Sequence, residues 1–260
     1  LADENLQDSI EAELNKFDLS LSMFNEKSTL SKINNSGTEG FDLSKDPWAY
    51  RVISESLKIS EMTNGAFDIT VAPLVNAWGF GFKKKSDVTD TVIDSLRKLV
   101  GYKLLMLKEK TLYKKYPGMM LDASAVAKGY SCDVIAELFE RHGISDYMIE
   151  IGGEMALKGK NPEAGKWRIG ISVPNDDSTS SNMDWQEKLV LTDKCIATSG
   201  NYRRFYIKDG KKYAHTINPA TGYPIQHSLL SATVVADNCL TADALATAFM
   251  VMGVDKALKL

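Results

Sequence analysis

A short segment near the middle of the chain places one acid and one base among small side chains. Asp122 and Lys128 are separated only by alanine, serine and valine, and a helical pattern follows them. Small side chains let a ligand approach the backbone, and a helix start offers free N–H groups to an anion. Lys128 would add a positive point charge for a phosphate. The segment therefore indicates a phosphate-binding loop; the alternative is an alanine-rich helix start with a solvated lysine.

A second pattern could hold a metal ion on a helix near the C-terminus. Asp243 and Thr247 are spaced so that both project from the same side of a helix. The apolar residues of this helix gather on a different side, and they are Leu245, Ala248, Phe249 and Met252. One carboxylate and one hydroxyl suit Mg²⁺, which takes oxygen ligands and commonly has phosphate oxygens among them. An exposed acid and hydroxyl on a surface helix is the alternative.

Two further stretches are richer in polar and turn-forming residues than a core requires. Gly152 and Gly153 precede Glu154 directly after a predicted strand, where paired glycines either admit a ligand or only turn the chain. His215, one of 3 histidines, opens a turn-rich stretch that ends at Pro224. A histidine in such a place is either a catalyst or a hydrogen-bonded structural residue.

Helical periodicity and capping residues predict the elements that must carry these groups. An apolar stripe at steps of three and four residues runs through the N-terminal part, as an amphipathic helix requires. Asp46 followed by Pro47 is typical of a helix start, and Asn64 followed by Gly65 is typical of a helix end. The predicted helices cover residues of about 4–20, a short turn after Ser28, 47–62, 71–78, 89–99, 127–141 and 239–252.

Alternating and β-branched stretches predict short strands in the rest of the chain. They cover residues 103–108, 147–151, 167–173, 188–191, 195–199, 203–208, 211–215 and 229–236. Asp209 followed by Gly210 is the strongest hairpin signal among them. Helices and strands mix without a regular βαβ repeat and without a linker-like segment. We therefore predict an α+β fold rather than a doubly wound sheet.

Composition narrows the class of protein further. The 31 basic and 34 acidic side chains give a formal net charge of −3, with 44% hydrophobic and 25% charged residues. These values exclude a disordered chain and argue against a nucleic-acid binder, which carries a basic excess. No apolar run is long enough to span a bilayer. The 3 cysteines lack CxxC spacing, so we expect buried thiols rather than a zinc site or a redox dithiol.

Six segments, taken in order along the chain, resemble the ApbE family, the FAD:protein FMN transferases. They comprise residues 65–81, 122–129, 152–154, 197–203, 215–224 and 241–248. The resemblance implies one ApbE-like, T-fold-like domain over residues 1–260. It also implies that the α+β fold has mixed, largely antiparallel sheets with packed helices.

The resemblance also implies roles for individual residues. It assigns contacts with FAD to seven positions, which are Phe24, Ala66, Phe67, Asp68, Asp122, Lys128 and Ile217. It assigns Mg²⁺ binding to the side chains of Asp243 and Thr247 and to the carbonyls of Ala125 and Ala246. Phe24 stands where the family usually has tyrosine, so it keeps the stacking ring without the hydroxyl.

The implied activity is Mg²⁺-dependent transfer of FMN from FAD, the substrate, to a threonine of an acceptor protein, with release of AMP. His215 is the candidate general base, because an unperturbed imidazole titrates near neutral pH, and Asp243 is the second candidate. Two other functions would use the same motifs. They are a Mg²⁺-dependent FAD pyrophosphatase, in which water replaces the threonine, and a non-catalytic FAD-binding protein.

The same resemblance implies a partner and a location. The expected acceptor is a protein such as a subunit of a membrane redox complex, and no nucleic-acid partner is expected. The protein is expected in the periplasm or as a membrane-anchored lipoprotein facing outside the cytoplasm. The chain starts at Leu1 and lacks the family's opening Met-Gly-Thr strand and final strands, so we expect trimming at both ends, with any lipid anchor lost.

Overall fold

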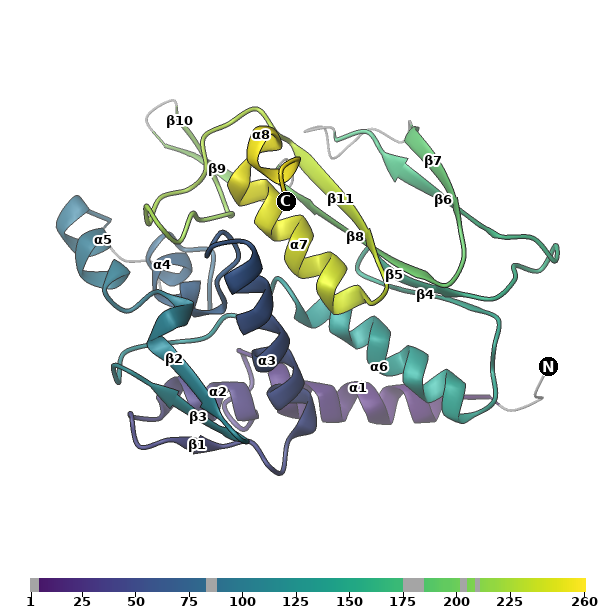
Figure 1. The fold of residues 1–260 in the computed structure, drawn as a ribbon, viewed down its shortest axis with the longest axis horizontal. Helices are drawn as coiled ribbons and strands as arrows, with labels where there is room; N and C mark the ends of the chain where they lie inside the picture. The colour runs from purple at the N-terminus through teal and green to yellow at the C-terminus, as the bar shows by residue number, and fades with distance from the viewer. Residues whose placement is uncertain (1–4, 83–87, 175–184, 202–204, 209–210) are drawn as a thin grey trace.

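The computed structural model describes residues 5–82, 88–174, 185–201, 205–208 and 211–260 (Figure 1). Its helices are α1 (Gln7–Leu21), α2 (Thr29–Asn35), α3 (Pro47–Met62), α4 (Ala72–Ala77), α5 (Asp90–Arg97), α6 (Ala127–Arg141), α7 (Cys239–Met252) and α8 (Val254–Ala257). Its strands are β1 (Phe41–Asp42), β2 (Leu105–Lys108), β3 (Thr111–Lys114), β4 (Tyr147–Ile151), β5 (Glu154–Lys158), β6 (Trp167–Ser172), β7 (Trp185–Leu191), β8 (Lys194–Gly200), β9 (Phe205–Lys208), β10 (Lys211–Ala214) and β11 (Ser231–Ala236).

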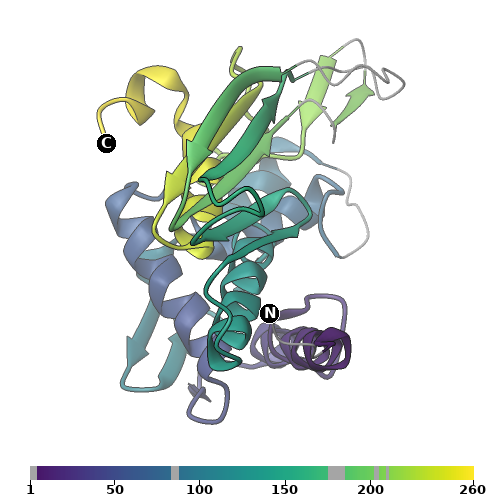
Figure 2. The same cartoon turned by 90° about the vertical axis from the view of Figure 1, so that its right-hand side faces the viewer.

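A four-stranded antiparallel sheet supports the C-terminal half of the molecule. Its strands lie in the order β11-β8-β5-β4, and α6 and α7 pack side by side against it (Figures 1 and 2). Small buried side chains meet where α7 crosses β8 and β11, and they include Ala197, Val234, Ala242 and Ala246. Because these side chains are small, α7 lies close to the sheet, and its direction is fixed by the strands beneath it.

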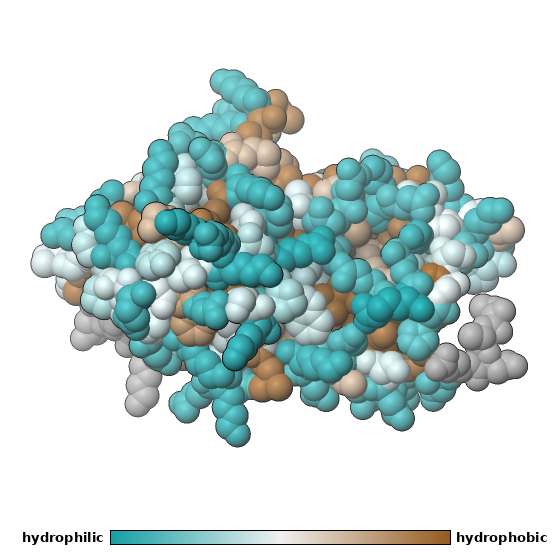
Figure 3. Space-filling view, turned by 60° about the horizontal axis from the view of Figure 1, so that its bottom comes forward, coloured by the Kyte–Doolittle hydropathy of each residue, from teal (hydrophilic) through white to brown (hydrophobic). Residues whose placement is uncertain are grey.

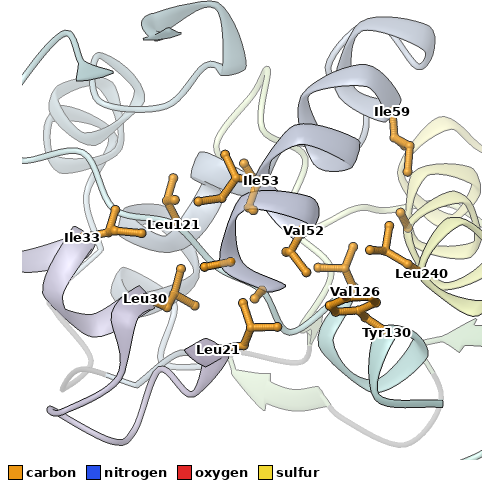
Figure 4. Packing of buried hydrophobic residues seen from close by; sticks show 14 of the residues in the cluster. Leu21, Leu30, Ile33, Val52, Ile53, Ile59, Leu121, Val126, Tyr130 and Leu240 are labelled. Atoms are coloured by element: carbon orange, nitrogen blue, oxygen red, sulfur yellow. The ribbon is translucent and has the colours of Figure 1, made fainter. Parts of the chain in front are cut away.

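A second layer of helices covers α6 and α7 on the side away from the sheet. Helix α1 packs on α6, and α3 packs on α7. The largest group of buried apolar side chains fills this junction (Figure 4), and it includes Leu21, Leu30, Ile33, Val52, Ile53, Ile59, Leu121, Val126, Tyr130 and Leu240. Burial of apolar area is the main stabilising contribution to folding. This core therefore holds the two helices that carry the predicted metal and phosphate ligands.

Capping residues fix the ends of the helices as the sequence predicts. The Oδ1 atom of Asp46 accepts hydrogen bonds from the Ala49 N–H at 3.0 Å and from the Ser20 hydroxyl at 2.8 Å. Asp46 therefore caps α3 and also connects the start of α3 to the end of α1. Asn238 caps α7 by accepting from the Thr241 N–H at 2.8 Å. These caps satisfy backbone donors that the first turn of a helix leaves unpaired.

The structure confirms the predicted helices and the α+β class, but three strands were not predicted. Strands β1 and β3 pair with each other in a small sheet, and β5 lies between β4 and β8 in the large one. The sequence of β5, Glu-Met-Ala-Leu-Lys, consists of residues that favour helices, so cross-strand pairing overrides local propensity there. The predicted turn at Asp209 and Gly210 lies outside the described residues, and the flanking β9 and β10 pair antiparallel.

One face of the molecule is mainly hydrophilic (Figure 3). In Figure 3, hydrophilic residues dominate the face in view, and hydrophobic residues lie between them in small separate areas. Within the described ranges, no helix combines the length and the apolar composition needed to cross a membrane.

Candidate functional site

A cavity of about 650 Å³ lies where the loop after α1, the segments around residues 66–81 and 122–128, strand β8, the stretch after β10 and helix α7 meet. It is lined by Met23, Phe24, Ala66, Phe67, Asp68, Val71, Val75, Phe80, Gly81, Asp122, Ser124, Ala125, Lys128, Gly152, Thr198, Ser199, Gly200, His215, Thr216, Ile217, Pro219, Asp243, Thr247 and Val251. Every predicted site residue except Ala246 is among them. Ala246 is fully buried behind the cavity, against the sheet.

Asp243 is a buried acid whose surroundings change its chemistry. Its side chain lines the cavity although the residue is only 3% exposed, so the surface-helix alternative is wrong. Its Oδ2 atom accepts a hydrogen bond from the Gly129 N–H at 3.0 Å. Burial raises the pKa of Asp243 to about 7; the ammonium of Lys128 opposes this shift, and the carboxylate of Glu154 adds to it. Asp243 is therefore an acid that a cation in the cavity would stabilise in its charged form.

Thr247 lies one turn after Asp243 and adds a hydroxyl to the same wall. Its Oγ1 atom is 3.0 Å from the Oγ atom of Ser199 on β8. The sequence predicted that the apolar face of α7 packs inward and that Asp243 and Thr247 lie on the opposite face. Instead, α7 is buried on almost every side, and the pair faces an internal cavity rather than solvent.

The close approach of α6 and α7 depends on a glycine. A Cβ atom at Gly129 would lie 2.3 Å from the carbonyl oxygen of Cys239 and 2.8 Å from the Cβ of Asp243. No side chain fits in this space, because the first obstacle is backbone rather than a flexible side chain. The absence of a side chain lets the Gly129 N–H reach the Asp243 carboxylate, so α6 presents its N-terminal turn to the acid.

Lys128 is held at the cavity by a buried partner. Its ammonium forms an ion pair with the Oε1 atom of Glu154, whose side chain is only 2% exposed, whereas the Lys128 side chain is 50% exposed. The other carboxylate oxygen of Glu154, Oε2, is buried and has no hydrogen-bond partner within the described part of the chain. Lys128 is therefore half-exposed but has a protein partner, unlike the solvated lysine considered from the sequence. The pair directs the Lys128 charge into the cavity, which it lines.

Asp122 is placed by a contact that spans 87 residues of sequence. The side-chain amide of Asn34 on α2 accepts from the Leu121 N–H at 2.7 Å and donates to the Leu121 carbonyl at 2.9 Å. The next residue, Asp122, is buried, and burial raises its pKa. The Ser124 N–H donates to its Oδ1 atom at 2.8 Å and opposes that shift. The loop thus presents its acid to the cavity in one fixed position.

Asp68 mainly holds the backbone that lines the cavity. Its Oδ1 atom accepts from the N–H and hydroxyl of Thr70 at 2.9 and 2.6 Å, and its Oδ2 atom accepts from the Tyr102 N–H at 2.8 Å. Burial raises the pKa of Asp68, and these hydrogen bonds oppose the shift. The residue thus ties the segment that follows Ala66 and Phe67, two other lining residues, to the backbone of Tyr102.

His215 lies at the aromatic side of the cavity. Its ring meets the edge of the Phe80 ring at 6.4 Å between centroids, and both residues line the cavity. Phe80 in turn stacks on Tyr206 at 5.4 Å. Ile217, two residues further on, is buried and pairs with Pro224 in an isolated β-bridge. Aromatic and apolar side chains therefore line this cavity together with the charged groups.

A protein-family model described as the ApbE family matches residues 1–260. The chain belongs to the ApbE family. Proteins named "FAD:protein FMN transferase" are similar to it over nearly its whole length: that of Vibrio cholerae is 39% identical over 98% of this chain and 75% of its own, and that of Escherichia coli K12 is 36% identical over 97% and 72%.

Solved structures of ApbE proteins share the fold. The flavin transferase ApbE from Vibrio cholerae has a TM-score of 0.88 at 38% identity, covering 100% of this chain and 82% of that one. The apo form of the flavinyl transferase ApbE from Pseudomonas stutzeri has a TM-score of 0.87 at 30% identity, covering 100% and 79%. The fold predicted from the resemblance is therefore confirmed.

The ApbE cavity has a donor set that suits Mg²⁺. Asp243 offers a buried carboxylate, Thr247 offers a hydroxyl one turn later, and Ala125 lines the same cavity from the Asp122–Lys128 loop. Hard oxygen donors are the ligands that Mg²⁺ prefers. The strongly raised pKa of Asp243 indicates a carboxylate whose charge the surrounding protein leaves poorly compensated. The residues present thus fit the ion that the resemblance implies.

Phe24 is the most exposed residue of the predicted set, and its exposure makes its role testable. The residue is 77% exposed at the mouth of the cavity, so it does not plug a groove between α1 and the core. We expect Phe24→Ala to raise the dissociation constant of FAD about fivefold, because a ring stack contributes about 1 kcal/mol. The melting temperature of the FAD-free protein should stay unchanged.

The measurement is fluorescence titration of FAD without divalent cations, beside thermal melts of the FAD-free proteins. Phe24→Tyr serves as the control, since it keeps the ring and should bind FAD as well as the parent or better. A lower melting temperature for Phe24→Ala with unaltered FAD affinity would show that the ring is structural.

Sequence reasoning missed several residues that hold the site in place. Met23 and Val251 line the cavity with no signal in the sequence beyond their apolar character. Glu154 was noticed only as the residue directly after a glycine pair, and no local signal pointed to its partner Lys128, which lies on α6. Asn34 had no local signal, because its partner is distant in the chain.

Proposed function

We propose that this protein is an Mg²⁺-dependent FAD:protein FMN transferase, which moves FMN from FAD to a threonine of an acceptor protein. One observation carries the proposal: a single cavity brings the Asp122–Lys128 loop together with Asp243 and Thr247 of α7. Its volume of about 650 Å³ lies within the range of small-molecule sites. The names of the similar proteins support the same activity.

The reaction exchanges one phosphorus–oxygen bond for another. The threonine oxygen forms a bond with the FMN-side phosphorus of FAD, and the bond from that phosphorus to the bridging oxygen breaks. AMP leaves with the bridging oxygen, and the threonine hydroxyl gives up its proton to a base. Transfers of this type depend mainly on positioning and on neutralising charge at the phosphate oxygens.

The chain's own residues provide both of these effects. Asp243 and Thr247 are the side chains that would hold Mg²⁺, with backbone carbonyls at Ala125 and Ala246. When bound, Mg²⁺ supplies positive charge to the pyrophosphate oxygens. Lys128 adds a second positive charge on the same side of the cavity, and Glu154 holds it in place.

The proton of the threonine has two candidate acceptors in the cavity. His215 stays our candidate general base, because an imidazole in water titrates near neutral pH and its ring lies on the cavity wall. Asp243 is the second candidate where the metal ion does not occupy its carboxylate fully, since the side chain lines the same cavity. A His215→Asn variant distinguishes them: loss of the acidic limb of the pH–rate profile assigns the base to His215.

The activity is tested by incubating the protein with FAD and Mg²⁺, with and without a threonine-bearing acceptor. AMP released only with the acceptor, together with added FMN mass on that acceptor, supports transfer. AMP and FMN released equally without the acceptor would instead show hydrolysis of FAD. Intact FAD in both mixtures would mean a binding protein and would overturn the proposal.

Lys128 should act on the rate more than on binding. We expect Lys128→Ala to lower the maximal rate of AMP release by on the order of 100-fold, because its charge faces negative charge that grows during the reaction. The FAD dissociation constant should rise much less. Steady-state rates and equilibrium titrations measure the two effects separately.

A matched variant controls for the partner that this substitution leaves behind. Lys128→Ala strands the buried carboxylate of Glu154, so the double variant Lys128→Ala/Glu154→Gln tests whether the loss reflects disturbed packing. The rate should stay low in the double variant while its melting temperature recovers. An unaltered maximal rate with weaker FAD binding would mean that Lys128 only binds FAD.

We also propose that the acceptor is a subunit of a membrane redox complex and that transfer takes place outside the cytoplasm. The support is the family resemblance alone. Cell fractionation of the full-length gene product, with mass spectrometry of flavin-bearing peptides in each fraction, tests both statements. A flavinylated acceptor in the cytoplasmic fraction only would contradict them.

A further inference from the structure

The three cysteines of the chain, which are far apart in sequence, come together in one buried cluster. Cys132 lies on α6, Cys195 on β8 and Cys239 at the start of α7, and each is at most 7% exposed. Asp133, the neighbour of Cys132, is also buried. The absence of CxxC spacing argued against a metal site, but that spacing reveals only cysteines that are close in sequence. Here the fold brings the three cysteines together from three separate elements.

Asp133 and two of the thiols have the geometry of a ligand group. One ligand atom from each of Asp133, Cys195 and Cys239 lies within 4.8 Å of the other two. The sulfur of Cys195 is 3.9 Å from the Oδ1 atom of Asp133. In a tetrahedral zinc site with thiolate ligands, the ligand atoms are roughly 3.8 Å apart. Small side-chain movements would therefore bring the three atoms onto one ion.

The cluster is accessible from a second cavity. This cavity has a volume of about 330 Å³, and both Asp133 and Cys195 line it. Its wall includes both acidic and basic side chains, among them Glu137, Lys158 and Lys194. Among the described residues, it shares no lining residue with the cavity of about 650 Å³ in which FAD is proposed to bind, which we call the FAD cavity. An ion could enter here without passing the site of flavin transfer.

We propose that Asp133, Cys195 and Cys239 form a binding site for a thiophilic divalent cation, Zn²⁺, whose fourth position opens to the second cavity. Two thiolates and one carboxylate match the ligand preferences of Zn²⁺. This site is separate from the proposed Mg²⁺ site and does not depend on the proposed transfer.

The ion would have to displace protons to bind. The neighbouring Cys132 and Cys195 thiols, together with burial, raise the pKa of the Cys239 thiol above its usual range. Without metal, Cys239 donates to the Met155 carbonyl at 2.9 Å. Binding therefore releases one proton from each coordinating thiol and becomes stronger as the pH rises.

Asp133 can take part without losing its structural role. Its two carboxylate oxygens accept from the N–H groups of Cys239 and Leu240 at 2.7 and 2.9 Å, which anchors the start of α7. Each carboxylate oxygen has a second lone pair, so these hydrogen bonds leave capacity for a metal. The bound ion would then clamp the first turn of α7, one turn before Asp243.

Cobalt provides the test, since Co²⁺ replaces Zn²⁺ and reports on its ligands. Titration of the reduced, full-length chain with Co²⁺ in excess Mg²⁺ should produce a thiolate-to-cobalt charge-transfer band, which Zn²⁺ then abolishes. Excess Mg²⁺ keeps Co²⁺ from the oxygen ligands of the FAD cavity, and those ligands give no thiolate band in any case. Cys195→Ser and Cys239→Ser should weaken binding by more than about 10- to 100-fold, which is the loss typical when only a hydrogen-bond partner of a ligand is removed.

Cys132→Ser is the matched control, because this thiol is equally buried but outside the three-ligand group. It should keep the band and the affinity of the parent. Thermal melts show whether each variant is folded. If Cys239→Ser does not fold, Asp133→Asn is tested in its place. The proposal is overturned if saturating Co²⁺ gives no charge-transfer band, or if Cys195→Ser keeps the parent's affinity.

Discussion

Replacing Asp243 by asparagine is expected to lower Mg²⁺-dependent release of AMP from FAD by about 100- to 1000-fold. The amide keeps the size of the side chain and an oxygen that can accept from the Gly129 N–H, so the contact between α6 and α7 persists. What it removes is the negative charge that a buried cation requires. Chromatography of AMP and FMN over a series of Mg²⁺ concentrations measures the effect.

Thr247→Val is the comparison for this variant. A neutral hydroxyl contributes less to holding a dication than a carboxylate does, so Thr247→Val should reduce turnover less than Asp243→Asn. Turnover at the parent's level in Asp243→Asn would show that the proposed metal site is wrong.

The buried carboxyl group of Asp243 also affects the stability of the folded protein. The pKa of Asp243 is raised from 3.8 in the unfolded chain to about 7 in the folded protein, so folding favours its protonated form. Its contribution to stability is complete below about pH 4 and is lost as the pH rises through 7. At about 1.4 kcal/mol per pKa unit, the loss amounts to roughly 4 kcal/mol at most.

Asp243→Asn should not show this loss, because the amide does not titrate. In metal-free buffer above pH 7, the variant should therefore be more stable than the parent, and the difference should disappear near pH 4. Urea unfolding at both pH values tests this. Equal stability of the two proteins at pH 8 would mean that the carboxylate is well solvated or paired in the free protein.

Gly129→Ala is expected to destabilise the protein by about 1–3 kcal/mol, although alanine usually favours a helix by about 1 kcal/mol. The steric effect dominates because the new Cβ would lie 2.3 Å from the Cys239 carbonyl oxygen, which belongs to the backbone of α7. The two helices must separate to relieve this contact. Asp243 then moves away from the loop that carries Lys128, so turnover should fall as well.

Thermal melts and AMP release measure the two consequences together. Gly165→Ala is the matched control, since its nearest neighbour would lie 3.7 Å from the new Cβ, an ordinary contact. The control should keep both its melting temperature and its activity. Gly129→Ala with the parent's melting temperature would show that α6 and α7 separate at no cost.

Local patterns predicted those elements whose signals lie within a few residues. The Asp46–Pro47 start and the Asn64–Gly65 end of α3 are chemical signals of this kind, and the structure places both as predicted. Most of the predicted site residues are embedded in runs of small or turn-forming residues, which carry the family resemblance. All of the predicted site residues but Ala246 reach one cavity.

What the sequence could not provide are contacts between distant residues. Lys114 is almost fully buried, yet its ammonium donates to the carbonyls of Ile33, Ser36 and Met119 and thereby ties the end of α2 to the segment before Asp122. From the sequence alone, a single lysine in a short strand would be expected to be exposed to solvent. The same applies to Glu154, whose partner lies on another element, and to β5, whose residues favour a helix.

The walls of the FAD cavity run from Met23 to Val251 in the sequence, and α7 supplies the last of them. A nascent chain, which grows at about 5–20 residues per second, therefore displays the Asp122–Lys128 loop, and then its partner Glu154, well before Asp243 faces them. A product that terminates before α7 has the Asp122–Lys128 loop but no Asp243. The ability to use FAD therefore depends on the synthesis of α7, and chains released before α7 cannot consume the flavin.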